Sequence, residues 1–187
     1  MTTNHSRGFK LQDALFIGFC ATLLVALKSM LRLKLGLAGH SMLLMSFFYL
    51  TCYCTVGRIG AITACGVMAG AVAAILGIGN GGPLIFMKFF APALAMEIVL
   101  MLVQRFTNLR WRLVIVALAG TLAWAAKGLI EDLLVGMSWQ VALARFSWKV
   151  LQGGIFAVVG ALLVLPVVRR LKAHDLVHSE SKLDQEL

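Results

Sequence analysis

A set of polar, charged and aromatic side chains stands at the ends of, or within, long apolar runs of this 187-residue sequence. Its members are His40, Asn80, Lys88, Glu97, Trp124, Lys127, Glu131, Arg145, Trp148, Lys149 and Gln152. Lys127 and Glu131 can pair on one helix face, whereas no acid follows Arg145 and Lys149 within their own run. This excess of donors predicts a small ligand with an acidic or electron-rich group. The indole faces suit either stacking on a ring or holding a cation, and the sequence leaves both open.

Each of these residues taken singly has a plainer interpretation. Tryptophan at the end of a membrane helix commonly anchors it at the interface, and lysine there extends its charge to the headgroups. Glu97 differs, because an ionisable group inside a span is costly and usually has a partner. Lys88 can reach it only across a kink at Pro92, and Lys127 or Lys149 from other spans are equally suitable. The cluster as a whole is the stronger indication of a binding site.

The elements that must position these side chains are predicted to be membrane helices. The chain is 60% hydrophobic and 13% charged, with a mean hydropathy of +0.91, which excludes an ordinary soluble domain. The apolar runs predict six spans: Leu11–Leu31, Ser41–Val56, Ile59–Gly77, Pro83–Val103, Leu113–Ile130 and Phe146–Val168. We therefore expect an all-α, polytopic membrane protein. A six-helix bundle would occupy residues 1–172, followed by a polar cytoplasmic tail over 173–187.

The third and fourth predicted spans form the hairpin beside which we expect the ligand chamber. Four glycines, an asparagine and a proline lie between Gly77 and Pro83 and predict a turn. Pro92 should kink the return helix or end a first short segment. Gly66 and Gly70 make the preceding helix narrow, which favours packing inside the bundle over a homodimer face.

A ridge of small residues on the first predicted span is the candidate docking surface. Gly18, Thr22 and Ala26 recur every four residues and share one helix face, so another helix can approach closely. A neighbouring span of the same chain and a partner protein suit this ridge equally well.

Basic residues decide the expected orientation. A net charge of +9 would suggest nucleic acid as a partner of a soluble protein, but here most Lys and Arg stand at span ends, where they meet anionic lipid. The side that carries both termini holds a modest majority of them. We therefore expect a multi-pass protein of the cell (inner) membrane with both termini cytoplasmic, and no nucleic-acid partner. The longest connection is expected over Glu131–Arg145.

Motifs for catalysis, nucleotides and metals are missing from the sequence. Its four cysteines, Cys20, Cys52, Cys54 and Cys65, stand inside apolar runs without C-x-x-C spacing. We expect buried free thiols, with a quinone-linked thiol oxidoreductase as the alternative. No P-loop, H-E-x-x-H or G-x-S-x-G occurs. We therefore expect no enzyme, no catalytic residue, no metal and no cofactor.

The run from Leu31 to Leu100 resembles the substrate-binding (S) component of energy-coupling-factor (ECF) transporters. The resemblance rests on Gly39-His40-Ser41, on Gly57-Arg58-Ile59-Gly60-Ala61, on the Gly/Ala helix with its glycine hairpin, and on Pro83 followed by Lys88-Phe89-Phe90-Ala91-Pro92. It implies six helices and a ligand pocket near the outer face. It also implies that the ridge of the first helix docks on a transmembrane coupling protein, which two cytoplasmic ATPase subunits drive.

The function that follows from the resemblance is substrate capture for the uptake of a vitamin or other micronutrient. A structural membrane scaffold of the cell envelope, with the same bundle but a filled pocket, is the first alternative. A small membrane enzyme acting on lipid or thiols is the second. Binding of a small molecule would separate the first two, because a binder gains stability with its ligand and a scaffold does not.

Overall fold

Six helices account for nearly all of the part of the chain that this computed structural model describes, residues 11–35, 40–77, 84–103 and 108–173. They are α1 (Leu11–Leu35), α2 (His40–Val56), α3 (Ala61–Ile75), α4 (Leu84–Val103), α5 (Leu109–Leu134) and α6 (Trp139–Ala173). The predicted all-α class is confirmed. The expected glycine hairpin at Gly77–Pro83 and the tail over 173–187 fall almost wholly outside the described residues.

Four of these helices are long and apolar enough to cross a membrane: α1 over Leu11–Leu31, α4 over Ile85–Val103, and α5 and α6 over nearly their full length. α2 and α3 are apolar too, but their 17 and 15 residues measure only about 26 and 22 Å, against about 30 Å of hydrocarbon. The apolar helices indicate a membrane protein. Six helices are confirmed, and six crossings stay a prediction.

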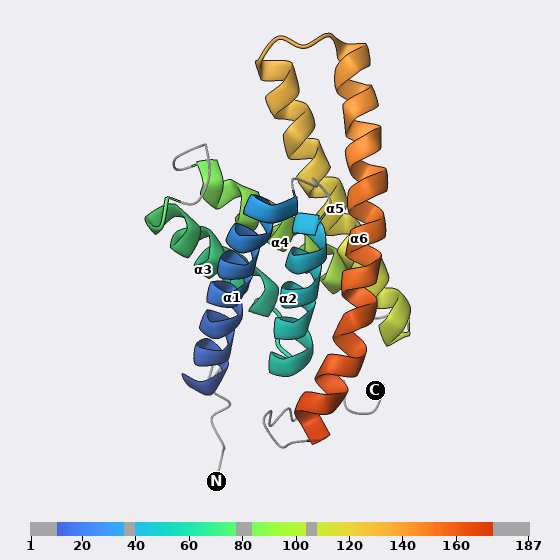
Figure 1. Cartoon of the computed structure of the whole chain (residues 1–187). Coiled ribbons are helices and arrows are strands. Elements are labelled where there is room, and N and C mark those ends of the chain that lie inside the picture. The colour runs from blue at the N-terminus through green and yellow to red at the C-terminus, as the bar shows by residue number, and fades with distance from the viewer. Residues whose placement is uncertain (1–10, 36–39, 78–83, 104–107, 174–187) are drawn as a thin grey trace.

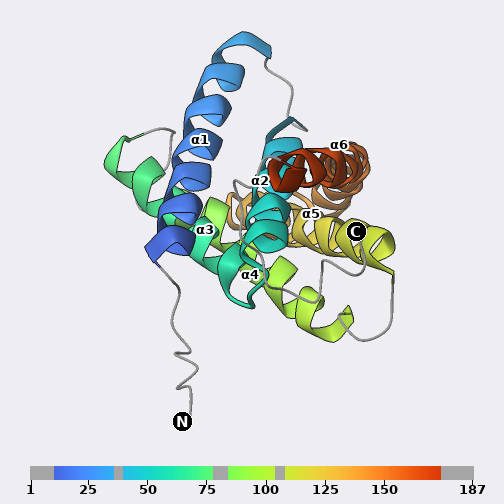
Figure 2. The same cartoon turned by 90° about the horizontal axis from the view of Figure 1, so that it is seen from below.

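α2 is the central helix of the bundle. It packs against α1, α3, α5 and α6, while α3 with α4 and α4 with α5 complete the surrounding ring. Twelve of its residues are buried, among them Tyr49 and Tyr53. Figure 2 shows α2 between α1 on one side and the α5–α6 pair on the other. The first residue of α1 and the last of α6 lie at the same end of the molecule (Figure 1).

Glycines mark the places where helices approach most closely. A Cβ on Gly66 would collide with the Cβ of Ala93, and one on Gly70 would lie 2.8 Å from the ring of Phe86. Both contacts join α3 to α4 inside the chain, as the sequence predicted. The backbones of α2 and α6 approach more closely than those of α3 and α4, because a Cβ on Gly160 would lie 2.6 Å from the carbonyl oxygen of Leu43, against 3.2 Å from the nearest α4 carbonyl at Gly66 and Gly70.

α4 continues as one helix through Pro92. The expectation that Pro92 ends a first short segment is therefore wrong. Proline lacks the N–H that would satisfy a carbonyl of the preceding turn, and in membranes neighbouring helices supply such partners. The carbonyl that loses its donor to Pro92 is that of Lys88. The next carbonyl along, that of Phe89, accepts a hydrogen bond from the Tyr49 hydroxyl of α2 at 3.0 Å, which ties α4 to α2 beside the proline.

The predicted connection over Glu131–Arg145 is the clearest error in the sequence analysis. α5 runs on to Leu134 and α6 begins at Trp139, so the two helices meet across only four residues. Gly136, with a φ of 86°, closes α5, because its N–H and that of Met137 donate to the carbonyls of Leu133 and Asp132. The polar stretch is therefore helical and forms a hairpin.

Candidate functional site

The α5–α6 hairpin extends well beyond the rest of the bundle (Figure 1). Gly153 marks the point of departure, since a Cβ there would meet Met42 near the start of α2. Residues 127–134 of α5, the turn, and residues 139–152 of α6 are called the arm below. Its α6 side contains 14 residues and measures about 20 Å. Ala125 and Ala142 are buried between the two helices but lie outside the main hydrophobic cluster.

The arm gathers charges of both signs around Asp132. The Lys149 ammonium donates to one carboxylate oxygen of Asp132 at 3.2 Å, and the Arg145 guanidinium lies 3.6 Å from the other. Two cations therefore share one acid across the α5–α6 interface. Asp132 is largely buried there, whereas more than half of the Arg145 side chain is exposed. The cluster thus leaves one positive charge uncompensated at a solvent-facing surface.

A glycine gives Lys149 room to reach Asp132, and a second ion pair lies on the same helix as this acid. Lys149 reaches Asp132 by crossing Gly128, where an added Cβ would lie 2.9 Å from the lysine nitrogen. Lys127 donates to Glu131 one turn along α5, which confirms the predicted pair. The Arg145 guanidinium also contacts the Met137 sulfur at 3.5 Å. The arrangement holds the Lys149 nitrogen in place and leaves the outer face of Arg145 available.

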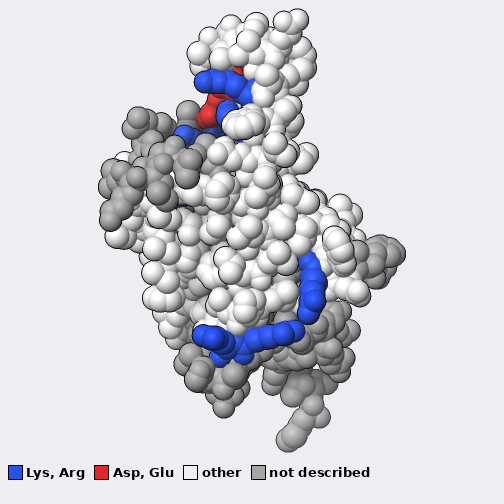
Figure 3. All heavy atoms as spheres, turned by 45° about the vertical axis from the view of Figure 1, so that its right-hand side comes forward, with Lys and Arg blue, Asp and Glu red and all other residues white. Residues whose placement is uncertain are grey.

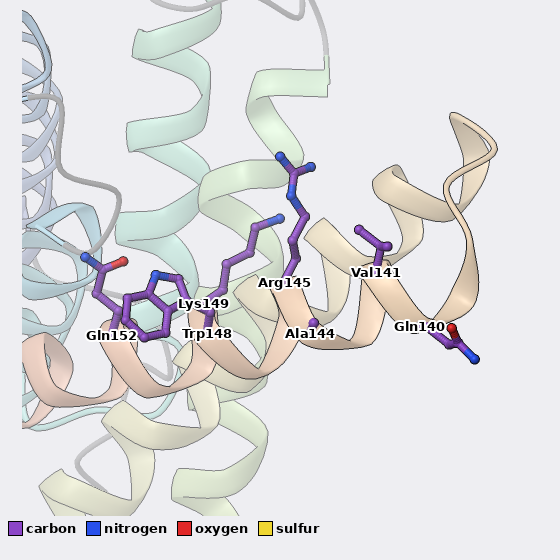
Figure 4. Close-up of a pocket in the computed structure, with 7 residues that line it drawn as sticks. All are labelled: Gln140, Val141, Ala144, Arg145, Trp148, Lys149 and Gln152. Atoms are coloured by element: carbon purple, nitrogen blue, oxygen red, sulfur yellow. The ribbon is translucent and has the colours of Figure 1, made fainter.

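A hollow of about 720 Å³ lies along this face of α6. Its described lining residues are Gln140, Val141, Ala144, Arg145, Trp148, Lys149 and Gln152. Figure 4 shows Arg145 and Lys149 rising to the same side of the helix, with Trp148 and Gln152 toward the bundle. Trp148 is 66% exposed, so its ring is free to receive a partner. Cationic donors, an amide and an open indole surface suit the non-covalent binding of a flat or anionic molecule.

Three other residues expected at this site lie on different helices, and only Trp124 is shown beside the base of the arm. Trp124 of α5 faces Gly153, with its ring 3.4 Å from where a Cβ would stand. His40 opens α2 and is partly buried, and Lys88 is partly buried on α4. None of these three residues, Trp124, His40 and Lys88, belongs to the described lining of the hollow. Asn80 lies outside the described residues.

Glu97 lies away from the arm and caps the N-terminus of a helix. Its carboxylate accepts hydrogen bonds from the backbone N–H of Gly60 at 2.6 Å and of Thr63 at 3.0 Å. These groups form the N-terminus of α3, where no side chain of α3 provides a cap. The negative charge therefore complements the positive end of the helix dipole. The predicted pairing with Lys88, Lys127 or Lys149 is wrong, because backbone donors satisfy this carboxylate.

The position of Glu97 also separates it from the hollow. Gly60 follows the C-terminal end of α2, whereas the arm departs near its N-terminal end. The 17 residues of α2 place these two ends about 25 Å apart. Glu97 is only 5% exposed. It therefore lies outside the predicted cluster, as a buried helix cap.

The ridge on α1 is accessible in part. Thr22 and Ala26 are exposed, while a Cβ on Gly18 would lie 3.2 Å from Met68 of α3. The Thr22 hydroxyl donates back to the carbonyls of Gly18 and Phe19, at 3.1 and 2.9 Å, so it presents a methyl group outward. Leu15 and Phe19 beside it are exposed as well. The outer face of α1 is therefore largely apolar, with small residues exposed at Thr22 and Ala26.

On one face of the molecule, the charged side chains of the described residues gather in two zones (Figure 3). Figure 3 shows Lys, Arg and acidic side chains near the arm, a line of Lys and Arg at the opposite end, and uncharged surface between them on that face. Arg110, Arg169 and Arg170 are exposed at helix ends away from the arm. An uncharged belt between two charged zones is the pattern that a bilayer requires.

Two residues with tertiary contacts were absent from the predicted site: Asp132 on the arm and Lys28 on α1. Asp132 was recognised only as part of a polar connection, although Gly136 and Ser138 mark a helix end and a helix start there. Lys28 stands within the first predicted span, and its ammonium lies 4.1 Å from the centre of the Phe89 ring. It also approaches the Met45 sulfur at 4.0 Å. No spacing rule could have found these contacts, because they join α1 to α2 and α4.

All four cysteines are free and buried, as predicted. Within the described ranges, no group of three or more His, Cys, Asp or Glu is arranged to hold a metal ion. Comparison of the chain with protein-family models, with curated proteins and with solved structures finds no match. The geometry of the arm is therefore the principal guide to function.

Proposed function

We propose that the protein is the substrate-capture membrane subunit of an ECF-type uptake transporter and binds a small micronutrient in the hollow along α6. The observation that carries the proposal is the lining of that hollow. Arg145, Trp148, Lys149 and Gln152 were selected from sequence as ligand-binding residues, and all four line one space of about 720 Å³. That volume is large enough for a small organic molecule, and the hollow is an open, mainly apolar surface along one helix.

The charges favour a ligand with an anionic group. Asp132 holds Lys149 and leaves one net positive charge, most of it on Arg145, to meet a carboxylate or phosphate. The exposed indole of Trp148 would stack on a ring of the same ligand. A flat, negatively charged, vitamin-like molecule satisfies both groups at once.

The proposal places the arm outside the cell and both termini in the cytoplasm, with α2 and α3 completing six crossings. If the two shorter helices α2 and α3 do not cross the membrane, the chain makes four crossings instead of six. Both numbers are even, so the termini lie on the same side in either case. Single cysteines at Val135 and Arg170, each in a cysteine-free chain, test this in intact cells with a membrane-impermeant maleimide. Labelling at position 135 alone supports the proposal, and labelling at position 170 alone reverses the orientation.

The outer face of α1 is the proposed docking surface for a coupling protein that works with two ATPase subunits. Ala26→Leu adds bulk to the exposed part of the ridge on α1 without contacting the core, whereas the larger side chain of Gly18→Leu would also collide with Met68. Ala26→Leu should therefore reduce recovery of the coupling module in a pull-down. Ala126→Leu, at an exposed alanine of α5, is the matched control. Equal recovery with both variants would contradict docking through α1.

Ligand binding is tested on protein purified into lipid nanodiscs. Native mass spectrometry first looks for a co-purified small molecule, and a panel of vitamins and their precursors then tests thermal stabilisation. A ligand at 100 times its Kd should add about 2.7 kcal/mol of stability. Trp148→Ala should weaken binding about tenfold, while Trp111→Ala, equally exposed at the other end of α5, should leave it unchanged. A chain that no ligand stabilises would instead be a membrane scaffold.

A further inference from the structure

The ion cluster of the arm contains two cations and one acid, and only the cations line the hollow. The Lys149 ammonium lies 3.2 Å from one carboxylate oxygen of Asp132, and the Arg145 guanidinium lies 3.6 Å from the other. Arg145 and Lys149 rise to the same side of α6 (Figure 4), whereas Asp132 is absent from the described lining. The acid therefore contacts both cations from α5 without forming the surface that a ligand would meet.

Asp132 is close enough to act on an anion bound in the hollow. A ligand group that contacts either cation would lie about 6 Å from the Asp132 carboxylate, because two successive contacts of about 3 Å separate the two negative groups. Only 16% of the Asp132 side chain is exposed, so water surrounds it less than it surrounds Arg145. Asp132 therefore repels each negative charge that a ligand brings to the cations.

The charge of a ligand affects its attraction to the cluster and its hydration in different ways. Attraction to fixed charges rises in proportion to the charge of the ligand, whereas the cost of removing water from an ion rises with the square of that charge. Two cations and one acid give the cluster a net charge of +1. For a doubly charged group the attraction is about twice that of a singly charged one, and the hydration cost is about four times as large.

We propose that Asp132 selects the charge of the ligand, so that the hollow takes a molecule with one carboxylate in preference to a phosphate monoester. This inference rests on the proposed function and narrows its ligand from anionic molecules in general to singly charged acids. The exposed ring of Trp148 would contact the flat part of such a molecule whatever its charge. An aromatic or heteroaromatic ring with a single acidic group is therefore the expected substrate class.

The test compares two probes of the same shape that differ by one charge. The ester 1-naphthyl sulfate carries one negative charge, and 1-naphthyl phosphate carries close to two at about pH 8. Isothermal titration measures both Kd values on the full chain in phosphatidylcholine nanodiscs. The parent chain should bind the sulfate more tightly. Asp132→Asn should improve sulfate binding about 3- to 10-fold and phosphate binding by the square of that factor, about 10- to 100-fold.

Glu131→Gln is the matched control. It removes the neighbouring acid of α5, which pairs with Lys127 and lies outside the described lining of the hollow. The control should change neither Kd by more than about twofold. If Asp132 only supports the arm or orients the cations, Asp132→Asn should weaken both probes by the same factor, and that result would overturn the proposal. A parent chain that prefers the phosphate would overturn it as well.

Failure of this inference is distinguishable from failure of the proposed function. If both probes bind and Asp132→Asn improves them equally, the ligand site stands and the selective role of Asp132 falls. If neither probe binds, the hollow is no site for flat anions, and both proposals fail. If phosphatidylglycerol added to the nanodiscs blocks the sulfate probe, a singly charged phosphodiester headgroup occupies the site. That result would support the charge preference and contradict the capture of a micronutrient.

Discussion

Two acidic residues of similar chemistry occupy opposite ends of this molecule and are held in different ways. Glu97 is almost completely buried, and backbone N–H groups of Gly60 and Thr63 at the start of α3 satisfy its carboxylate. Asp132 lies at the base of an open surface, where two cationic side chains compete for it. The first arrangement is closed and leaves no group for a ligand. The second has a positive charge in excess and space beside it.

This difference separates a structural charge from a candidate binding charge. A buried carboxylate bonded to a helix N-terminus stabilises one packing of two helices, because its removal takes the acceptor from two partly buried backbone donors. Charges on the arm cost little to keep, since solvent surrounds much of Arg145 and Glu131. The bundle therefore gains stability from Glu97, whereas the arm can exchange its internal pairs for contacts with a ligand.

The largest expected effect is at Glu97. Glu97→Ala should lower the free energy of unfolding by about 2–3 kcal/mol, because two partly buried N–H groups lose their acceptor at roughly 1–3 kcal/mol each. Thermal unfolding in nanodiscs measures the loss. Glu97→Gln retains one acceptor oxygen and should lose less, and Glu131→Gln on the exposed arm is the control. A Glu97→Ala chain as stable as its parent would remove the distinction between the two ends.

Two glycine substitutions compare how tightly the bundle and the arm are packed. Gly160→Ala should cost about 1–3 kcal/mol, because its Cβ meets the backbone carbonyl of Leu43, which cannot move aside. Gly128→Ala on the arm meets only the flexible end of Lys149 and should cost less than about 1 kcal/mol. Chemical unfolding of both variants gives the two values. Equal losses would mean that the arm is packed as rigidly as the bundle.

The ion pairs of the arm should contribute less than the Gly160 contact in the bundle. Asp132→Asn breaks the bridge to Lys149 and Arg145, and we expect a loss of at most about 1 kcal/mol, because these side chains are partly solvated. The same change frees two cations, so the affinity for an anionic ligand should rise. Isothermal titration with the ligand identified by native mass spectrometry checks the gain. A weaker affinity would mean that Asp132 orients the cations that bind.

The smallest effect is expected for the pair of Lys127 and Glu131. Both variants, Lys127→Ala and Glu131→Ala, should change the free energy of unfolding by less than about 0.5 kcal/mol, as is usual for an exposed pair one helical turn apart. A double-mutant cycle in low and high salt isolates the coupling. A coupling above about 1 kcal/mol, insensitive to salt, would place this pair in a drier environment than the exposed arm provides.

Features encoded locally could be predicted from the sequence, and those created by tertiary contact could not. The helical class, the span over Leu11–Leu31 and the Lys127–Glu131 pair all follow from hydropathy and spacing. The hairpin over Val135–Ser138 was missed because polarity was given more weight than Gly136, whose positive φ ends α5. The role of Glu97 could not be predicted, because its partners are backbone N–H groups of residues 34 and 37 positions earlier in the chain.

The candidate site shows the same division. Arg145, Trp148, Lys149 and Gln152 share one face of α6 through their spacing, so a single correct helix assignment brings them together. Asp132 completes the cluster from α5, and only the close approach at Gly128 allows Lys149 to reach it. Sequence therefore supplied the α6 side of the site, while the acid that organises it required the fold.

A paired measurement on two variants tests the central distinction most directly. Thermal midpoint and ligand affinity are determined for Glu97→Gln and Arg145→Gln in the same nanodiscs, with the ligand found by native mass spectrometry. We predict that Glu97→Gln lowers the midpoint and leaves the Kd unchanged, whereas Arg145→Gln leaves the midpoint unchanged and weakens binding about 10- to 100-fold. A ligand that binds Arg145→Gln as tightly as the parent chain, or that needs Glu97, would contradict the account.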